Sequence, residues 1–151
     1  MLSIKKILVP TDFSDTADFA TEWALELAAR VEAEVRLLNV YDYPSYALPD
    51  GALIPSSDVV ADMLAEVETQ LEARRVRFHE RGVPVSFEAR QGAAVDDIVA
   101  HAAEWGADLI VMGTHGRAGL GHLLLGSVAE RVVRKSPCPV TTVRLPNSAK
   151  A

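Results

Sequence analysis

The segments 113–116 (Gly-Thr-His-Gly) and, after nine intervening residues, 126–127 (Gly-Ser) carry the clearest chemical signal in the chain. The apolar run 108–112 precedes them and a helical pattern at 128–135 follows, so a strand leads through a glycine-rich loop into a helix. Such a loop exposes backbone N–H groups and a helix N-terminus to an anion. Glycine allows positive φ and lets a ligand approach the backbone closely. The pattern therefore predicts a nucleotide phosphate site.

Two residues of this region have a structural as well as a functional interpretation. Ser127, with Glu130 three residues later, matches a capping box, which predicts that Ser127 caps the helix. A cap would also expose N–H groups beside the serine hydroxyl, so capping and phosphate binding are compatible. Arg117 could meet phosphate charge or lie solvated in the loop, and the sequence favours neither.

The loop matches neither of two common nucleotide-binding motifs. No Gly-x-x-x-x-Gly-Lys-Ser/Thr occurs in the chain, and no Gly-x-Gly-x-x-Gly follows the first strand. Phosphate charge would instead be met by backbone N–H groups, the helix dipole, Arg117 and a divalent ion. Asp12, His115 and Ser127 could be combined into a hydrolase triad, but the chain lacks the Gly-x-Ser-x-Gly turn. We therefore expect binding, with slow hydrolysis at most.

Strand-like and helical patterns alternate along the whole chain. Strands are expected at 7–9, 35–41, 83–90, 108–112 and 139–144, with helices between them. Ser14 or Asp15 could cap the first helix. Repeated βα units predict the α/β class, as a single-domain three-layer αβα sandwich around a five-stranded parallel sheet. The first, second and fourth strands read as mainly apolar runs, whereas the third alternates and the fifth is short and begins with a proline. The third and fifth strands are therefore expected at the edges of the sheet, in the strand order 3-2-1-4-5.

This strand order predicts a ligand crevice between the first and fourth strands. The connections diverge to opposite faces there, so the carboxyl ends of these strands border the crevice. Pro10, Thr11 and Asp12 follow the first strand, and the loop from Gly113 follows the fourth. Asp12 could be a ligand or a charge at a helix N-terminus, and its place at the crevice favours the ligand interpretation.

The composition is that of a globular domain with an excess of acidic residues. Of the 151 residues, 49% are hydrophobic and 24% charged, and the net charge is −6, so nucleic acid and anionic membranes are not expected partners. The lone cysteine, Cys138, fits a reducing compartment and is expected to be a small packed residue rather than a redox thiol. Without a recognisable signal peptide or membrane span, a cytoplasmic location is expected. Residues 1–145 are expected to form one domain and 146–151 a flexible tail.

Several of these segments together resemble the universal stress protein family. The resemblance lies in 7–14, 111–120, 124–130 and 137–140, within a similarity that extends from about Ile4 to Arg144. The family's ATP-binding subgroup is marked by Gly-x-x-Gly, nine residues and then Gly-Ser or Gly-Thr, which this chain matches without a gap. The resemblance implies the adenine-nucleotide alpha hydrolase-like fold and an ATP-binding protein of the stress response. Such a protein would act through nucleotide-dependent conformation or partner binding. The alternatives are a genuine ATPase or phosphotransfer enzyme, and a dimeric scaffold that binds no nucleotide.

The resemblance also assigns a role to each site residue. It implies that Asp12 and the backbone of Val40 hold the adenine and ribose end, and that Pro10, Thr11, Met112 and Gly113 line the ribose pocket. It implies that His115, Gly116, Gly126, Ser127 and Val128 hold the phosphates, with Mg2+ or Mn2+ bridging phosphate oxygens. A side chain in place of Gly113 or Gly126 is then expected to occupy ligand space and to leave the fold intact.

The last strand, the longest loop and two histidines raise further expectations. Val140–Val143 would be an unpaired edge in a monomer, and members of this family commonly pair there, so a homodimer is expected. The loop 42–57 begins on the ligand side and could form a lid or pack on a neighbouring subunit or helix; the sequence does not decide between these. His79 and His101 fall on helical patterns and are expected to be solvated.

Overall fold

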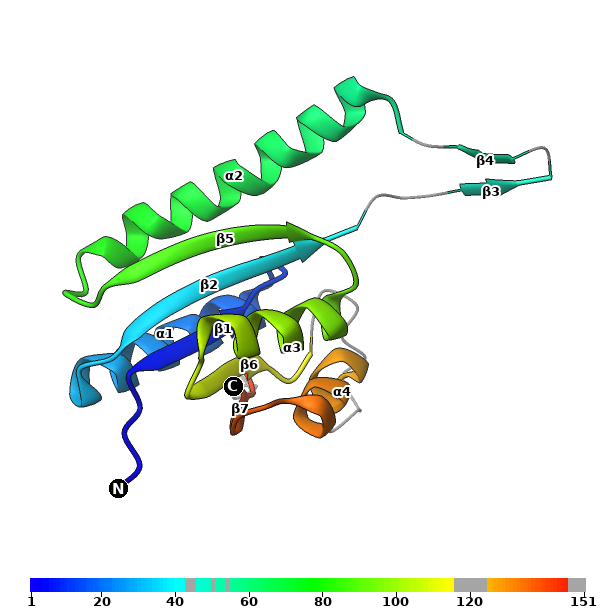
Figure 1. Cartoon of the computed structure of the whole chain (residues 1–151). Helices are drawn as coiled ribbons and strands as arrows, with labels where there is room; N and C mark the ends of the chain where they lie inside the picture. Colours follow the sequence, from blue (N-terminus) through cyan, green and yellow to red (C-terminus); the bar gives the residue numbers. More distant parts are fainter. Residues whose placement is uncertain (43–45, 50, 54, 116–124, 147–151) are drawn as a thin grey trace, which may run out of the picture.

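The computed structural model of the chain describes residues 1–42, 46–49, 51–53, 55–115 and 125–146, and its centre is a five-stranded parallel sheet (Figure 1). Along the chain the elements are β1 (Lys6–Pro10), α1 (Asp15–Val31), β2 (Glu34–Tyr41), β3 (Tyr46–Leu48), β4 (Gly51–Leu53), α2 (Ser57–His79), β5 (Val85–Gln91), α3 (Ala94–Trp105), β6 (Leu109–Gly113), α4 (Ser127–Lys135) and β7 (Val140–Val143). The sheet order is β5-β2-β1-β6-β7, and all four pairings are parallel. The predicted α/β class and the order 3-2-1-4-5, counted over these five strands, are confirmed.

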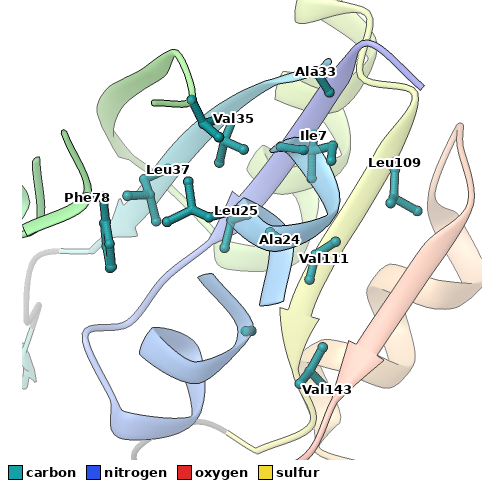
Figure 2. Packing of buried hydrophobic residues seen from close by; sticks show 14 residues of the cluster. Ile7, Ala24, Leu25, Ala33, Val35, Leu37, Phe78, Leu109, Val111 and Val143 are labelled. Carbon is teal, nitrogen blue, oxygen red and sulfur yellow. The ribbon is translucent and has the colours of Figure 1, made fainter. Parts of the chain in front are cut away.

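Helices cover both faces of the sheet, each pair over its own hydrophobic cluster. On one face, Leu25 of α1 and Phe78 of α2 belong to the same cluster as Leu37 of β2 (Figure 2). On the other face, Ile98 of α3 and Val132 of α4 belong to a second cluster. Apolar residues recur at helical spacing on the helices and at alternate positions on the strands, so each element presents an apolar side to the sheet. The result is the predicted three-layer αβα arrangement.

The position of β1 at the centre of the sheet explains why Ile7, Leu8 and Val9 are all apolar. Ile7, Leu8 and Val9 have no exposed surface, because β2 and β6 pair with the two edges of β1 and helices cover both faces. A strand enclosed in this way has no polar side. β5, at one edge of the sheet, is instead only half-buried from Val85 to Arg90.

The two helices that follow β1 and β6 start differently. Ser14 precedes α1, and its Oγ accepts a hydrogen bond from the backbone N–H of Ala17 at 3.2 Å, so the predicted serine cap is confirmed. At α4 the cap position is Gly126, and no side-chain cap hydrogen bond forms there among the described residues. The capping-box prediction for Ser127 is therefore wrong. The helix begins one residue earlier because the backbone of Gly126 docks on Thr114 and its carbonyl accepts the N–H of Glu130.

The segment between β2 and α2, expected to be a loop, contains a short antiparallel hairpin. β3 and β4 pair from Tyr46 opposite Leu53 to Leu48 opposite Gly51, in a sheet separate from the central one (Figure 1). The hypothesis of a lid depends partly on Tyr43 and Ile54, which lie outside the described residues. Outside them too is the predicted flexible tail 146–151, apart from its first residue.

Candidate functional site

The carboxyl ends of β1 and β6 lie side by side, because Ile7 and Leu8 pair with Leu109 and Ile110 in parallel register. The structure therefore brings together the two predicted segments, Pro10–Asp12 at the end of β1 and Met112–His115 at the end of β6. Pro10, Thr11 and Met112 are buried, whereas Asp12 and Gly113 keep part of their surface exposed. Two short backbone segments thus border the predicted crevice.

Hydrogen bonds fix the loop that follows β1. The backbone N–H of Thr11 donates to the carbonyl of Leu38, and the side-chain amide of Asn39 donates to the carbonyl of Thr11 at 2.9 Å. Asp12 Oδ1 accepts the N–H of Ser14 at 3.0 Å, and Thr11 Oγ1 accepts the N–H of Phe13 at 3.1 Å. The Asp12 carboxylate therefore stabilises the turn before α1, which is the structural interpretation of this residue. The ligand interpretation of Asp12 stays a prediction.

The loop that follows β6 is fixed at Thr114. This buried residue donates its backbone N–H to the carbonyl of Val143 in β7 at 2.9 Å, and its Oγ1 lies 3.0 Å from Nδ1 of His115. The carbonyl of Thr114 accepts the N–H of Gly126 at 2.6 Å. This last bond docks the start of α4 at the carboxyl end of β6. Gly116 and Arg117 lie outside the described residues, so their predicted roles have no structural counterpart here.

The glycines at the two ends of this loop are needed for internal packing. A Cβ at position 113 would lie 2.7 Å from Cγ2 of Thr16, and one at position 126 would lie 2.7 Å from the carbonyl oxygen of Thr114. Neither residue has a positive φ. The expectation that a side chain at either position would leave the fold intact is therefore wrong. These positions require glycine because β6 approaches α1, and α4 approaches β6, too closely for a side chain.

The start of α4 has the properties of an anion site. Ser127 and Val128 are exposed, and the first amides of a helix have no acceptor within that helix. The helix dipole adds partial positive charge at this end. Val40, assigned by the resemblance to the adenine end, lies near the carboxyl end of β2 and packs against the cluster under α3 and α4. Each predicted site residue that is described therefore lies on an element that reaches this edge of the sheet.

His101 and Cys138 both lie in buried or partly buried environments, as the sequence predicts for Cys138 but not for His101. His101 is 3% exposed, so the expectation that it is solvated is wrong. Burial lowers the pKa of His101 below its ordinary value, and the carboxylate of Glu88, 3.8 Å away, opposes this shift. His101 lies on the side of α3 that faces β2 and β5. Arg36 Nη1, from β2, is 3.4 Å from its Nε2. Cys138 packs against the second cluster, and burial raises the pKa of its thiol, as expected of a packed residue.

The described residues include no group of three or more His, Cys, Asp or Glu side chains that could hold a metal ion. The Mg2+ or Mn2+ that the resemblance implies, bridging phosphate oxygens, stays a prediction. Within the same part of the chain, no helix is both long and apolar enough to cross a membrane.

Comparisons with known proteins agree with this architecture. The model of the universal stress protein family matches residues 3–144. Universal stress protein MJ0531 of Methanocaldococcus jannaschii is 40% identical over 145 residues, which cover 94% of this chain and 83% of the relative. The solved structure of MJ0577 from the same organism superposes with a TM-score of 0.80 at 31% identity, covering 96% of this chain and 99% of the other. A universal stress protein solved in complex with cAMP superposes with a TM-score of 0.71 at 27% identity, covering 95% of this chain and 99% of the other.

Proposed function

The chain belongs to the universal stress protein family, and from that premise we propose that it binds an adenine nucleotide, ATP being the ligand that its glycine motif favours. The observation that carries the proposal is the bond of 2.6 Å between the Gly126 N–H and the Thr114 carbonyl. It brings a helix N-terminus to the strand end beside the loop of Asp12. The complex of another family member with cAMP supports the choice of an adenine nucleotide.

The family resemblance supports the roles that we propose for the individual residues. Asp12 and the Val40 backbone would hold adenine and ribose, and the ribose pocket would be lined by Pro10, Thr11, Met112 and Gly113. The phosphates would lie at the start of α4, against the amides of Ser127 and Val128 and beside Gly126, whose own N–H is held by the Thr114 carbonyl. His115, Gly116 and Arg117 would contribute from the preceding loop. A divalent ion bound through phosphate oxygens would offset the phosphate charge.

We propose binding rather than rapid turnover as the activity. The chain has no lysine in its glycine loop and no motif that assigns a base to the attacking water. A protein of this kind would act in the stress response through the conformation or partner that the bound nucleotide favours. A genuine ATPase is the alternative, and phosphate release measured on the same samples separates the two.

Calorimetric titration with Mg-ATP tests the proposal. We expect a dissociation constant in the micromolar to millimolar range and weaker binding in Asp12→Ala. Purified protein is also expected to release ATP on denaturation. Titrations with AMP, cAMP and GTP determine which part of the nucleotide is recognised. No heat of binding up to millimolar Mg-ATP, with no released nucleotide, would refute the proposed function.

We also propose that the protein is a homodimer paired through β7. β6 pairs with one edge of β7, and no other strand of the described residues pairs with its outer edge. An unpaired edge of this kind is a template for a second chain. Exposed apolar side chains on the adjoining elements, Val133 of α4 and Leu145 after β7, would gain cover in such a dimer.

A further inference from the structure

Arg74 of α2 is a buried guanidinium with a full set of partners. It is 8% exposed and follows Leu71 on the side of α2 that faces the core. Its Nε and Nη2 donate to Oδ1 and Oδ2 of Asp18 in α1, at 2.7 and 3.1 Å. Its Nη1 donates to the carbonyl and the side-chain oxygen of Gln70, at 3.1 and 2.8 Å. The two-pronged pair with Asp18 fixes the plane of the guanidinium.

The same guanidinium reaches the loop after β1. Arg74 Nη2 donates to the carbonyl of Phe13 at 3.2 Å, and its Cζ lies 4.7 Å from the centroid of the Phe13 ring. Phe13 has a φ of +64°, in the left-handed region that a bulky L residue rarely adopts. Such a conformation persists only where the surroundings determine it. Arg74 constrains Phe13 through both the carbonyl and the ring, in addition to the bond from the Phe13 N–H to Thr11 Oγ1.

Asp12 lies between two carbonyls that are held from elsewhere in the fold. Asn39 of β2 donates to the carbonyl of Thr11, on one side of Asp12, and Arg74 donates to the carbonyl of Phe13, on the other. The backbone on both sides of Asp12 is thus fixed by side chains from β2 and α2, which are remote in sequence. The direction of the Asp12 carboxylate depends on these two contacts together with the bond that it accepts from the Ser14 N–H.

We propose that Arg74 is a positioning residue of the nucleotide site. It holds Phe13 in the left-handed conformation, and thereby keeps Asp12 where it can meet the nucleotide. The inference rests on the proposed function. Lysine could not replace it, because one ammonium cannot engage both Asp18 oxygens, Gln70 and Phe13 in the same planar arrangement.

Arg77 is the matched control on the same helix. Its guanidinium also approaches Asp18, 3.7 Å from Oδ2, but its other partners are Glu22 at 3.3 Å and the ring of Phe78. Arg74→Lys and Arg77→Lys therefore make the same chemical change beside the same carboxylate. The contact with Phe13 distinguishes the two arginines.

The test combines Mg-ATP titration of the full chain with the 13Cα chemical shift of Phe13 in the free protein. Arg74→Lys is expected to raise the dissociation constant by about tenfold, the effect of losing a charge-assisted contact, and to move the Phe13 shift away from its left-handed value. Arg77→Lys is expected to change neither. Adding Phe13→Gly to Arg74→Lys is expected to restore part of the affinity, because glycine adopts positive φ without strain.

Unchanged affinity in Arg74→Lys, or reduced affinity with the Phe13 shift unchanged, would overturn the positioning role. If Arg74→Lys does not fold, Asp18→Asn, which removes the anchor of Arg74, is expected to weaken binding in the same direction. Unchanged affinity in that variant counts equally against the inference. A wild-type chain that fails to bind Mg-ATP would instead refute the proposed function, and the inference with it.

Discussion

Replacing Gly126 by alanine adds one methyl group at the start of α4, where the structure leaves no space for it. The added Cβ would lie 2.7 Å from the carbonyl oxygen of Thr114, whereas ordinary contacts begin at 3.4 Å. The obstacle is backbone rather than a movable side chain. The start of the helix would therefore have to retreat by about 0.7 Å, the difference between those distances, as in other overpacked sites.

This retreat affects both stability and the proposed site. Overpacking costs about 1–3 kcal/mol, and a weakened Gly126–Thr114 hydrogen bond costs about 1 kcal/mol more. In a chain of this length, 1 kcal/mol lowers Tm by about 2–4 °C, so we expect Gly126→Ala to melt at least about 4 °C below the wild type. Mg-ATP affinity should fall as well, because the helix N-terminus no longer lies against the end of β6.

Thermal melting and calorimetric titration of Gly126→Ala test this reasoning, with Ser127→Ala as the control for the melting experiment. Ser127 is exposed and is not the cap of α4, so its replacement should change the free energy of unfolding by less than about 0.5 kcal/mol. A Gly126→Ala chain that melts within a degree or so of the wild type would refute the close approach of α4 to β6. A loss of about 1 kcal/mol in Ser127→Ala would restore the capping-box interpretation.

Two further predictions concern the sheet edge and the buried histidine. The carbonyls of Pro139 and Val143 accept from β6, so by alternation the backbone of Thr142 faces the free edge. Light scattering should give twice 16.3 kDa for the wild type and a monomer for Thr142→Pro, and a monomeric wild type at micromolar concentrations would refute the dimer. Because burial lowers the pKa of His101 from 6.5, the unfolded chain binds a proton before the folded one does. The free energy of unfolding should therefore fall as pH drops below 6.5. His101→Gln should flatten this pH dependence, and the control His79→Gln should not. An equal slope in the two variants would contradict the role of His101.

The strand order could be predicted because the burial of each strand is recorded in its composition. β1 is enclosed on both faces and both edges, and its residues Ile7 to Val9 are accordingly all apolar. β5 and β7 each have a free edge within the described sheet, and their sequences show it through alternation and through the proline before β7. The crevice follows from that order alone, without knowledge of any side-chain contact.

The reasons for the glycines and for the buried charges could not be predicted in the same way. Gly113 and Gly126 were interpreted as room for a ligand, but the atoms that exclude a side chain belong to Thr16 and Thr114. The partners of Arg74 on α1 and in the β1 loop are 56 and 61 residues away in sequence. One signal was present: in α2 Arg74 shares a helical spacing with the apolar core residues at 67, 71 and 78. A charged residue at a core-facing position indicates a buried partner, but the sequence does not say which.

The two loops at the crevice share a dependence on remote elements, which bears on how binding data should be interpreted. Thr114 is held by the carbonyl of Val143 in β7, the strand proposed to pair between subunits, and Phe13 is held by Arg74 of α2. A substitution in β7 or α2 can therefore weaken nucleotide binding without touching the nucleotide. Thr142→Pro separates the effects at β7: if the dimer is lost and Mg-ATP affinity is unchanged, the bond between Thr114 and Val143 survives in the monomer. If both are lost together, the sheet edge and the nucleotide site are energetically coupled through that bond.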